Sequence, residues 1–137
     1  MKVVLDTNVL VSGLLAPFGP PGEMVRMVSS GSLQICFDAR ILSEYEEVLR
    51  RPKFGFSPDE TRLLLNQIQG DGFVVAADPL PHRLPDPWDE PFVEVAWAGK
   101  AEALITGNIR HFPRSACGGV FVVSPADFLD FYRKNKK

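Results

Sequence analysis

The chain has 137 residues, which suffices for one compact domain with a single core but not for two ordinary domains. A hydrophobic content of 45% and a charged content of 23% exclude a disordered chain and predict a globular protein. The formal net charge of −2 gives no overall basic character, so a polyanion must be held by a local patch or by bound metal.

Strand-like and helix-like segments alternate along the chain. Residues 2–5 are rich in Val and Leu, which is typical of a strand buried on both faces. The Pro- and Gly-rich cluster at residues 17–22 predicts a turn, and Ser57 followed by Pro58 predicts a helix start.

In chain order we predict a strand at residues 2–5, helices at 9–16 and 23–30, a strand at 33–37, helices at 39–51 and 58–69, a strand at 73–76, a loop at 78–91, a helix at 92–98, strands at 103–105 and 120–123, and a helix at 125–134. Strands that alternate with helices predict an α/β fold with a mainly parallel central sheet and helices on both faces. We expect a single domain over residues 1–137.

The two cysteines, Cys36 and Cys117, lack the spacing of a zinc site or of a disulfide framework. Cys36 lies in an apolar run and is expected to be a small buried side chain. This usage fits a reducing compartment, with one disulfide left open as the alternative. The N-terminus has no signal-peptide pattern and no stretch approaches membrane-spanning length, so we expect a cytoplasmic protein.

Polar residues follow the predicted strands, where ligands bind in open parallel sheets. These residues are Asp6, Asn8, Asp38, Asp78, Thr106 and Asn108. A carboxylate at Asp6, beside the hydroxyl of Thr7 and the amide of Asn8, suits a hard cation or a phosphate. An equally good alternative is that Asp6 caps the following helix.

The helix at residues 39–51 carries three neighbouring acids. Its apolar face leaves Glu47 on the opposite, solvated side, whereas Glu44 and Glu46 flank the two edges of the apolar stripe. Either of the last two could reach into a cleft beside the sheet, and periodicity does not choose between them. Without other evidence, surface charge is the simpler interpretation of all three.

Two aspartates precede the helix at residues 92–98. Pro91 belongs in the first turn of that helix, so the helix begins near Asp89 and Asp86 lies in the preceding loop. Asp89 stands above the inward face, where it could bind a ligand or simply favour the helix dipole. Asp86 is expected to shape the loop, with an outer-shell role at the site as the alternative.

The segment after the strand at residues 103–105 offers neutral and basic groups. Thr106 and Asn108 provide neutral ligands or hydrogen bonds, and Arg110 and His111 could contact phosphate. A lone histidine is more often structural or exposed than catalytic.

Taken together, these segments resemble the PIN domain family, in particular the group related to VapC-type toxins of bacterial toxin–antitoxin systems. The resemblance rests on Val-Leu-Asp-Thr-Asn around Asp6, Leu-Ser-Glu-Tyr around Glu44, Asp-Pro-Trp-Asp-Glu around Asp89 and Leu-Ile-Thr-Gly-Asn around Thr106. No single motif is specific, but the ordered set covers nearly the whole chain.

The resemblance implies a PIN-like three-layer α/β/α sandwich and metal-dependent hydrolysis of RNA phosphodiester bonds with Mg²⁺ or Mn²⁺. It implies that Asp6, Glu44 and Asp89 are the catalytic metal ligands, which would choose Glu44 over Glu46. The implied supporting residues are Asn8, Asp86, Thr106 and Asn108, and the expected RNA-binding residues are Arg83, Arg110, His111 and Arg114.

The resemblance also implies an RNA substrate, a cognate antitoxin protein, a homodimer and no membrane partner. Many family members carry a further acid where this chain has Asn108, or two residues later, where it has Arg110. This departure leaves open whether one or two metal ions bind. The basic tail at residues 133–137 is expected to be a solvated end rather than part of the RNA site.

Two other classes of protein compete with the PIN nuclease as interpretations of these residues. A receiver domain needs an acidic pair after its first strand, and an aspartyl-phosphatase of the haloacid dehalogenase type needs a second aspartate where Asn8 stands. The other rival is a PIN-like scaffold that binds RNA or a protein without cutting. Binding of magnesium or manganese would separate the enzyme from that scaffold.

Overall fold

Five parallel strands form the central sheet of the computed structural model, which describes residues 1–135. The strands are β1 (Lys2–Leu5), β2 (Gln34–Phe37), β3 (Phe73–Val74), β4 (Ala103–Ile105) and β5 (Val122–Val123). Their order in the sheet is β3-β2-β1-β4-β5. Val3 of β1 pairs with Ile35 on one side and with Ala103 on the other. The predicted α/β fold is confirmed, and the sheet is entirely parallel.

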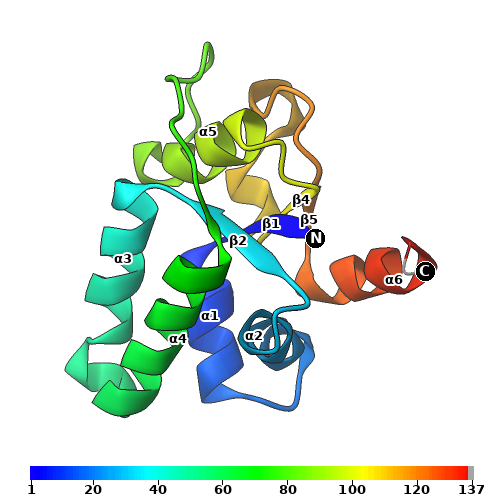
Figure 1. Cartoon of the computed structure of the whole chain (residues 1–137). Helices are drawn as coiled ribbons and strands as arrows, with labels where there is room; N and C mark the ends of the chain where they lie inside the picture. Colours follow the sequence, from blue (N-terminus) through cyan, green and yellow to red (C-terminus); the bar gives the residue numbers. More distant parts are fainter. Residues whose placement is uncertain (136–137) are drawn as a thin grey trace.

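Helices cover both faces of this sheet (Figure 1). The α-helices are α1 (Thr7–Leu15), α2 (Pro20–Ser29), α3 (Ala39–Leu49), α4 (Pro58–Asp71), α5 (Glu90–Ala98) and α6 (Pro125–Asn135). Helix α5 packs on β1, β2 and β4 from one side, while α1, α2, α4 and α6 form the layer on the other side. Short 3-10 helices are η1 (Pro52–Phe54), η2 (Pro87–Asp89), η3 (Ile109–His111) and η4 (Arg114–Ala116). The predicted three-layer sandwich is therefore confirmed.

The route of the chain creates a switch point between β1 and β4. From β1 the chain moves outward to β2 and β3, then returns across the other face through α5 and continues to β4 and β5. At such a reversal the loops after two neighbouring strands diverge and leave a crevice. Asp6 follows β1 and Thr106 follows β4, so two of the predicted site residues lie at this crevice.

The core explains why the strands could be found from sequence. Val3, Val4 and Leu5 of β1 are fully buried, as expected for a central strand covered on both faces. Cys36 and Cys117 are both buried and both free, so the alternative of a disulfide is wrong.

Several helix boundaries differ from prediction. Helix α2 begins at Pro20, not at residue 23, because prolines in a first turn lack only N–H groups that would have no partner there. Gly22 permits this start: a Cβ atom would lie 2.1 Å from the carbonyl oxygen of Pro17. Helix α1 begins at Thr7, α5 begins at Glu90, and α4 continues through Gly70 to Asp71.

The edge strands are shorter than predicted. Strand β3 has two residues instead of the predicted four, and both Phe73 and Val74 are exposed. Strand β5 likewise has two residues. Each edge strand pairs with one neighbour over two positions. Two residues are too few for an alternating or apolar pattern to define the ends of a strand.

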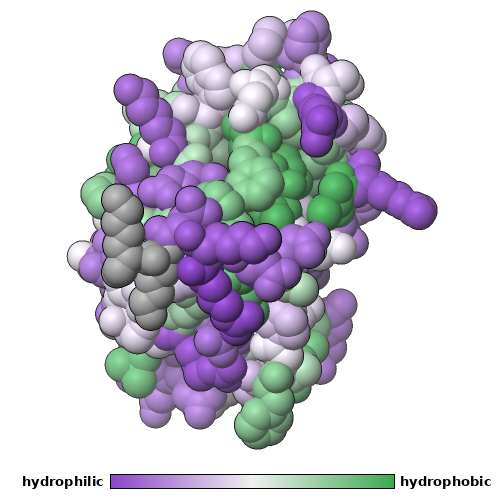
Figure 2. Space-filling view, turned by 90° about the vertical axis from the view of Figure 1, so that its right-hand side faces the viewer, coloured by the Kyte–Doolittle hydropathy of each residue, from purple (hydrophilic) through white to green (hydrophobic). Residues whose placement is uncertain are grey.

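Figure 2 views the molecule from the side of α6 and shows an apolar area surrounded by hydrophilic side chains. Near β5, the ring of Phe121 is partly exposed and lies 5.2 Å from that of Phe131 in α6. Arg133 and Lys134 of the predicted basic tail are exposed, and residues 136–137 lie outside the described part of the chain. Within residues 1–135, no helix combines the length and apolar character that crossing a membrane requires.

Candidate metal centre

Two buried hydrogen bonds from other elements fix the end of β1, one at Leu5 and one at Asp6. The Tyr45 hydroxyl of α3 donates to the carbonyl oxygen of Leu5 at 2.6 Å. The Thr106 hydroxyl, just after β4, donates to Asp6 Oδ2 at 2.7 Å. Asp6 occupies the N-cap position of α1 but makes no side-chain cap hydrogen bond. Its carboxylate is therefore free for a role other than capping.

Helix α3 brings Glu44, and not its neighbours, to the same place. The Thr7 hydroxyl at the start of α1 donates to Glu44 Oε2. Glu47 instead pairs with Arg51 at 2.8 Å on the exposed side of α3. Glu44 is therefore bonded to the residue that follows Asp6, which supports the choice of Glu44 that the resemblance implies.

Asp89 is the third carboxylate of the expected site, and the charges of Asp6 and Glu44 act on it. It lies where η2 meets α5, and its side chain makes no cap hydrogen bond to α5. The buried Oδ2 atom has no hydrogen-bond partner, although His111 Nδ1 lies 3.4 Å away. This contact is an ion pair when His111 is protonated.

Burial makes all three carboxylates harder to ionise, and the charge of Asp6 adds to this effect for Glu44 and Asp89. Burial is the main cause that raises the pKa of Asp6, and the hydrogen bond from Thr106 opposes it. Burial also raises the pKa of Glu44, with a further contribution from the negative charge of Asp6. For Asp89, burial and then the charge of Asp6 raise the pKa to about 6. A bound cation would stabilise the ionised forms of these three carboxylates.

Stability of the metal-free protein is expected to fall as the pH rises from about 4 to about 6. In this window Asp89 ionises in the unfolded chain but keeps its proton in the folded chain, because its folded pKa is about 6. The penalty is absent below the window and complete above it. Asp89→Asn should therefore raise the melting temperature at pH 8 by about 3 °C and leave it unchanged at pH 4. Thermal unfolding in EDTA measures both values.

Asp78→Asn is the matched control for this prediction, because Asp78 is an exposed aspartate on a loop. It should leave the melting temperature unchanged at both pH values. An Asp89→Asn variant that is no more stable than wild type at pH 8 would contradict the assigned burial of the Asp89 carboxylate.

The donor set fits a hard cation such as Mg²⁺ or Mn²⁺. Besides the carboxylates, the buried Asn8 Oδ1 atom has no hydrogen-bond partner and follows Asp6 by two residues. Within residues 1–135, no group of three His, Cys, Asp or Glu side chains lies close enough together to hold a metal ion by itself. Magnesium does not need such a group, since it commonly takes one or two carboxylates and keeps several waters. Unpartnered oxygens beside carboxylates are consistent with that mode of binding.

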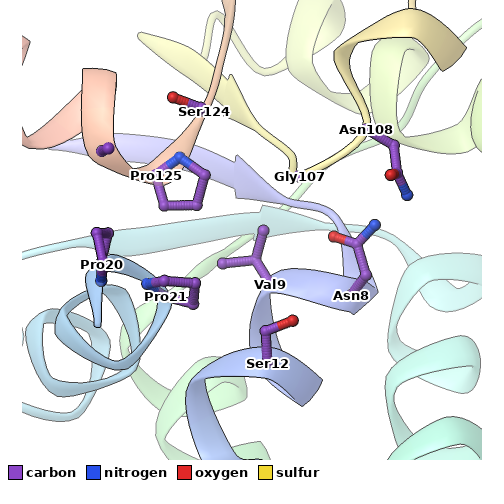
Figure 3. A pocket seen from close by; sticks show the side chains of 10 residues that line it. Asn8, Val9, Ser12, Pro20, Pro21, Gly107, Asn108, Ser124 and Pro125 are labelled. Atoms are coloured by element: carbon purple, nitrogen blue, oxygen red, sulfur yellow. The ribbon is translucent and has the colours of Figure 1, made fainter. Parts of the chain in front are cut away.

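A cleft of about 420 Å³ opens beside Asn8. Figure 3 shows Asn8, from the first turn of α1, and Asn108, from the loop after β4, near each other on its wall. Pro20 and Pro21 of α2 form another wall, and Ser12 lies one turn below Asn8. The backbone N–H of Asn108 donates to the Thr106 hydroxyl at 3.0 Å, which links the cleft to Asp6.

Other predicted site residues are held by local partners or are exposed, and the charge of Asp86 contributes to the raised pKa of Asp89. Asp86 accepts a hydrogen bond from the Trp88 backbone at 3.0 Å and shapes the start of η2, as predicted. Arg83 pairs with Glu90 at 3.1 Å, although 84% of its side chain is exposed. In the part of the chain that the structure describes, Arg110 and Arg114 are exposed and form no ion pair.

Two candidate strand-end acids have other surroundings. Asp38 caps α3 by accepting from the Ile41 backbone at 3.1 Å and also pairs with Arg40 at 2.7 Å. Asp78 is exposed on the loop beyond β3. Neither is part of the carboxylate group.

Sequence reasoning missed the supporting role of Tyr45. Its position on the apolar face of α3 predicted only burial, and the hydroxyl that reaches Leu5 left no signal in the spacing. It also missed Glu90 and Glu94, buried acids of α5 that accept from the backbone N–H groups of Leu84 and Leu80. These bonds attach the long loop before η2 to α5. Glutamates inside an otherwise apolar helix were the available clue.

Comparison with known proteins adds a family match. A sequence profile of the family described as PIN domain matches residues 2–110. A protein of Methanocaldococcus jannaschii, itself described as uncharacterized, is 29% identical over 111 residues, which cover 79% of this chain and 71% of that protein. The range matched by the profile includes Asp6, Glu44, Asp89 and Thr106.

Proposed function

Because the chain belongs to the PIN domain family, whose members are generally metal-dependent nucleases, we propose that it hydrolyses RNA phosphodiester bonds with Mg²⁺ or Mn²⁺. The observation that carries this proposal is the group of Asp6, Glu44 and Asp89. The negative charge of Asp6 raises the pKa of each of the other two, and the three side chains come from different elements.

In this proposal Asp6, Glu44 and Asp89 hold the metal, directly or through water. A bound divalent ion lowers the pKa of a water molecule and neutralises charge on the phosphoryl oxygens. The hydroxyls of Thr106 and Thr7 each donate to one oxygen of Asp6 and Glu44, respectively. Each carboxylate thereby keeps a fixed orientation with its second oxygen available, as supporting hydrogen bonds do around other metal sites.

Asn8 and Asn108 would contribute neutral oxygens or N–H groups beside the metal. Since both line the cleft next to Asp6, they are placed to contact the RNA backbone without adding negative charge. Arg83, Arg110, His111 and Arg114 are proposed to contact RNA phosphates, and salt-sensitive binding would follow from those contacts.

We further propose, from the resemblance to VapC-type toxins, that this nuclease is the toxin of a type II toxin–antitoxin system with a cognate antitoxin protein. The toxin role predicts that cells expressing the chain stop growing. A homodimer is proposed as well, supported by exposed apolar residues at both sheet edges, Phe73 and Val74 at β3 and Phe121 near β5. In sedimentation analysis a homodimer would show twice the chain mass of 15.2 kDa.

Metal removal is the first test of the proposed reaction. Purified protein incubated with a panel of RNAs and Mn²⁺ or Mg²⁺ should produce discrete fragments, and EDTA should abolish them. Gel electrophoresis of the products checks this directly. Intact RNA with either metal, together with no metal binding by calorimetry, would favour a PIN-like scaffold over an enzyme.

A further inference from the structure

A second hollow lies between α3 and the segment that leads from η2 into α5. We call it the Trp88 groove, and its volume is about 680 Å³, which is in the range of small-ligand sites. Glu44 lines this groove and is also one of the three carboxylates of the metal centre. Trp88, directly before Asp89 in the chain, is 78% exposed and forms part of the wall. The groove therefore borders the candidate metal centre at Glu44.

We propose that the Trp88 groove binds one unstacked base of a single-stranded RNA whose phosphate lies at the metal centre, with the Trp88 ring as the stacking surface. This inference rests on the proposed nuclease function and assigns to it a base-binding subsite at Trp88. Bases of single-stranded RNA stack on aromatic rings and guanidinium planes, and stacking tolerates any sequence because every base has a flat face.

The lining of the groove suits a base better than a phosphate. Ile41, Val48, Pro91 and Phe92 provide apolar walls. The arginines that line it are already paired: Arg40 with Asp38 and with Glu94, each at 2.7 Å, and Arg51 with Glu47 at 2.8 Å. Their charges are thus balanced locally. What Arg40 still offers is the planar face of a guanidinium held in place by two carboxylates.

Position favours RNA over a protein segment as the occupant. Asn8 and Asn108 line the cleft beside Asp6, and Glu44 lines the Trp88 groove. A nucleic-acid strand with its phosphate between these acids would have the polar cleft on one side and the apolar groove on the other. A large aromatic ring left this exposed beside candidate catalytic residues is a typical contact for a ligand with one flat apolar face.

Duplex RNA should not use this groove, because its bases remain stacked and paired. The proposal therefore predicts a preference for single strands that depends on Trp88. Trp97 provides a matched control, since it is 64% exposed on α5 but does not line the groove.

The test measures binding separately from cleavage, in the wild-type chain with Mg²⁺ and a single strand whose phosphorothioate linkages resist cleavage. By fluorescence anisotropy with a labelled 12-nucleotide single strand, Trp88→Ala should weaken binding about tenfold, Trp88→Phe should restore most of it, and Trp97→Ala should leave it unchanged. No binding by the wild-type chain, equal affinity of Trp88→Ala, or an equal loss for duplex RNA would overturn the proposal. So would a Trp88→Ala variant that changes only the oligomeric state in sedimentation, which would indicate a protein occupant.

Cleavage by the wild-type chain is assayed in parallel, so that the two proposals can fail separately. Trp88-dependent binding without any RNA cleavage in Mn²⁺ would support the groove and reject the nuclease. Cleavage with full single-strand affinity in Trp88→Ala would support the nuclease and reject the groove.

Discussion

Asp6→Asn is expected to lower the rate of metal-dependent RNA cleavage by about a thousandfold. Divalent metal stabilises the transition state by several kcal/mol, and each 1.36 kcal/mol corresponds to a factor of ten in rate. Asp6 is 7% exposed at the switch point of the sheet, where its carboxylate is fixed by Thr106. Asparagine keeps the shape and can still accept from that hydroxyl, but it loses the charge that would hold the cation. Single-turnover cleavage in Mn²⁺ measures the rate.

The fold should survive this change. Since burial raises the pKa of Asp6, the ionised carboxylate is unfavourable in the metal-free protein at neutral pH, and a neutral amide removes that cost. The melting temperature in EDTA should be unchanged or higher. The same variant should no longer arrest growth on expression, and Asp59→Asn on the exposed side of α4 should behave as wild type in every assay. Wild-type cleavage by Asp6→Asn would reject the proposed centre.

Glu44→Gln should lower the cleavage rate by about a hundredfold or more, whereas Glu46→Gln should change it less than about twofold. Both residues belong to α3 and differ by only two positions. Glu44 accepts the hydroxyl of Thr7, and its pKa responds to the charge of Asp6, so its charge is part of the centre. Because glutamine also accepts a hydroxyl, Glu44→Gln tests charge more than packing. The pair is compared at equal protein concentration and equal Mn²⁺.

Calorimetric titration with Mn²⁺ separates two ways in which Glu44→Gln could lose activity. A weaker metal affinity would support direct or water-mediated ligation by Glu44. Equal activity of the Glu44→Gln and Glu46→Gln variants would show that the family resemblance had chosen the wrong acid.

The layers of the fold were predictable because their signals are local. Apolar runs identify the buried strands, and Ser57-Pro58 identifies the start of α4, which Ser57 caps by accepting from the Glu60 backbone at 3.4 Å. The start of α2 was not predictable, since Pro20 and Pro21 occur equally in turns and in first helical turns. Only the close approach of Gly22 to Pro17, a tertiary contact, distinguishes the two cases.

The candidate site was predictable only in part for a similar reason. Asp6 and Thr106 could be placed because both follow central strands of a parallel sheet. The orientation of Glu44 depends on how α3 lies against α1, which no spacing within α3 encodes. The Trp88 groove depends on how α3 and α5, two elements far apart in sequence, lie relative to each other. The position of Trp88 in the sequence therefore did not predict a groove.

The hydrogen bond from Thr106 to Asp6 joins residues separated by 100 positions in the chain. A polypeptide emerging from the ribosome therefore carries Asp6 almost from the start of synthesis but cannot complete its surroundings until β4 has also emerged and paired with β1. Contacts of such long range form late in folding, after the closure of a large loop. During translation the acidic residues would thus remain apart, so under the proposed nuclease function a nascent chain would not cut the messenger from which it is being made.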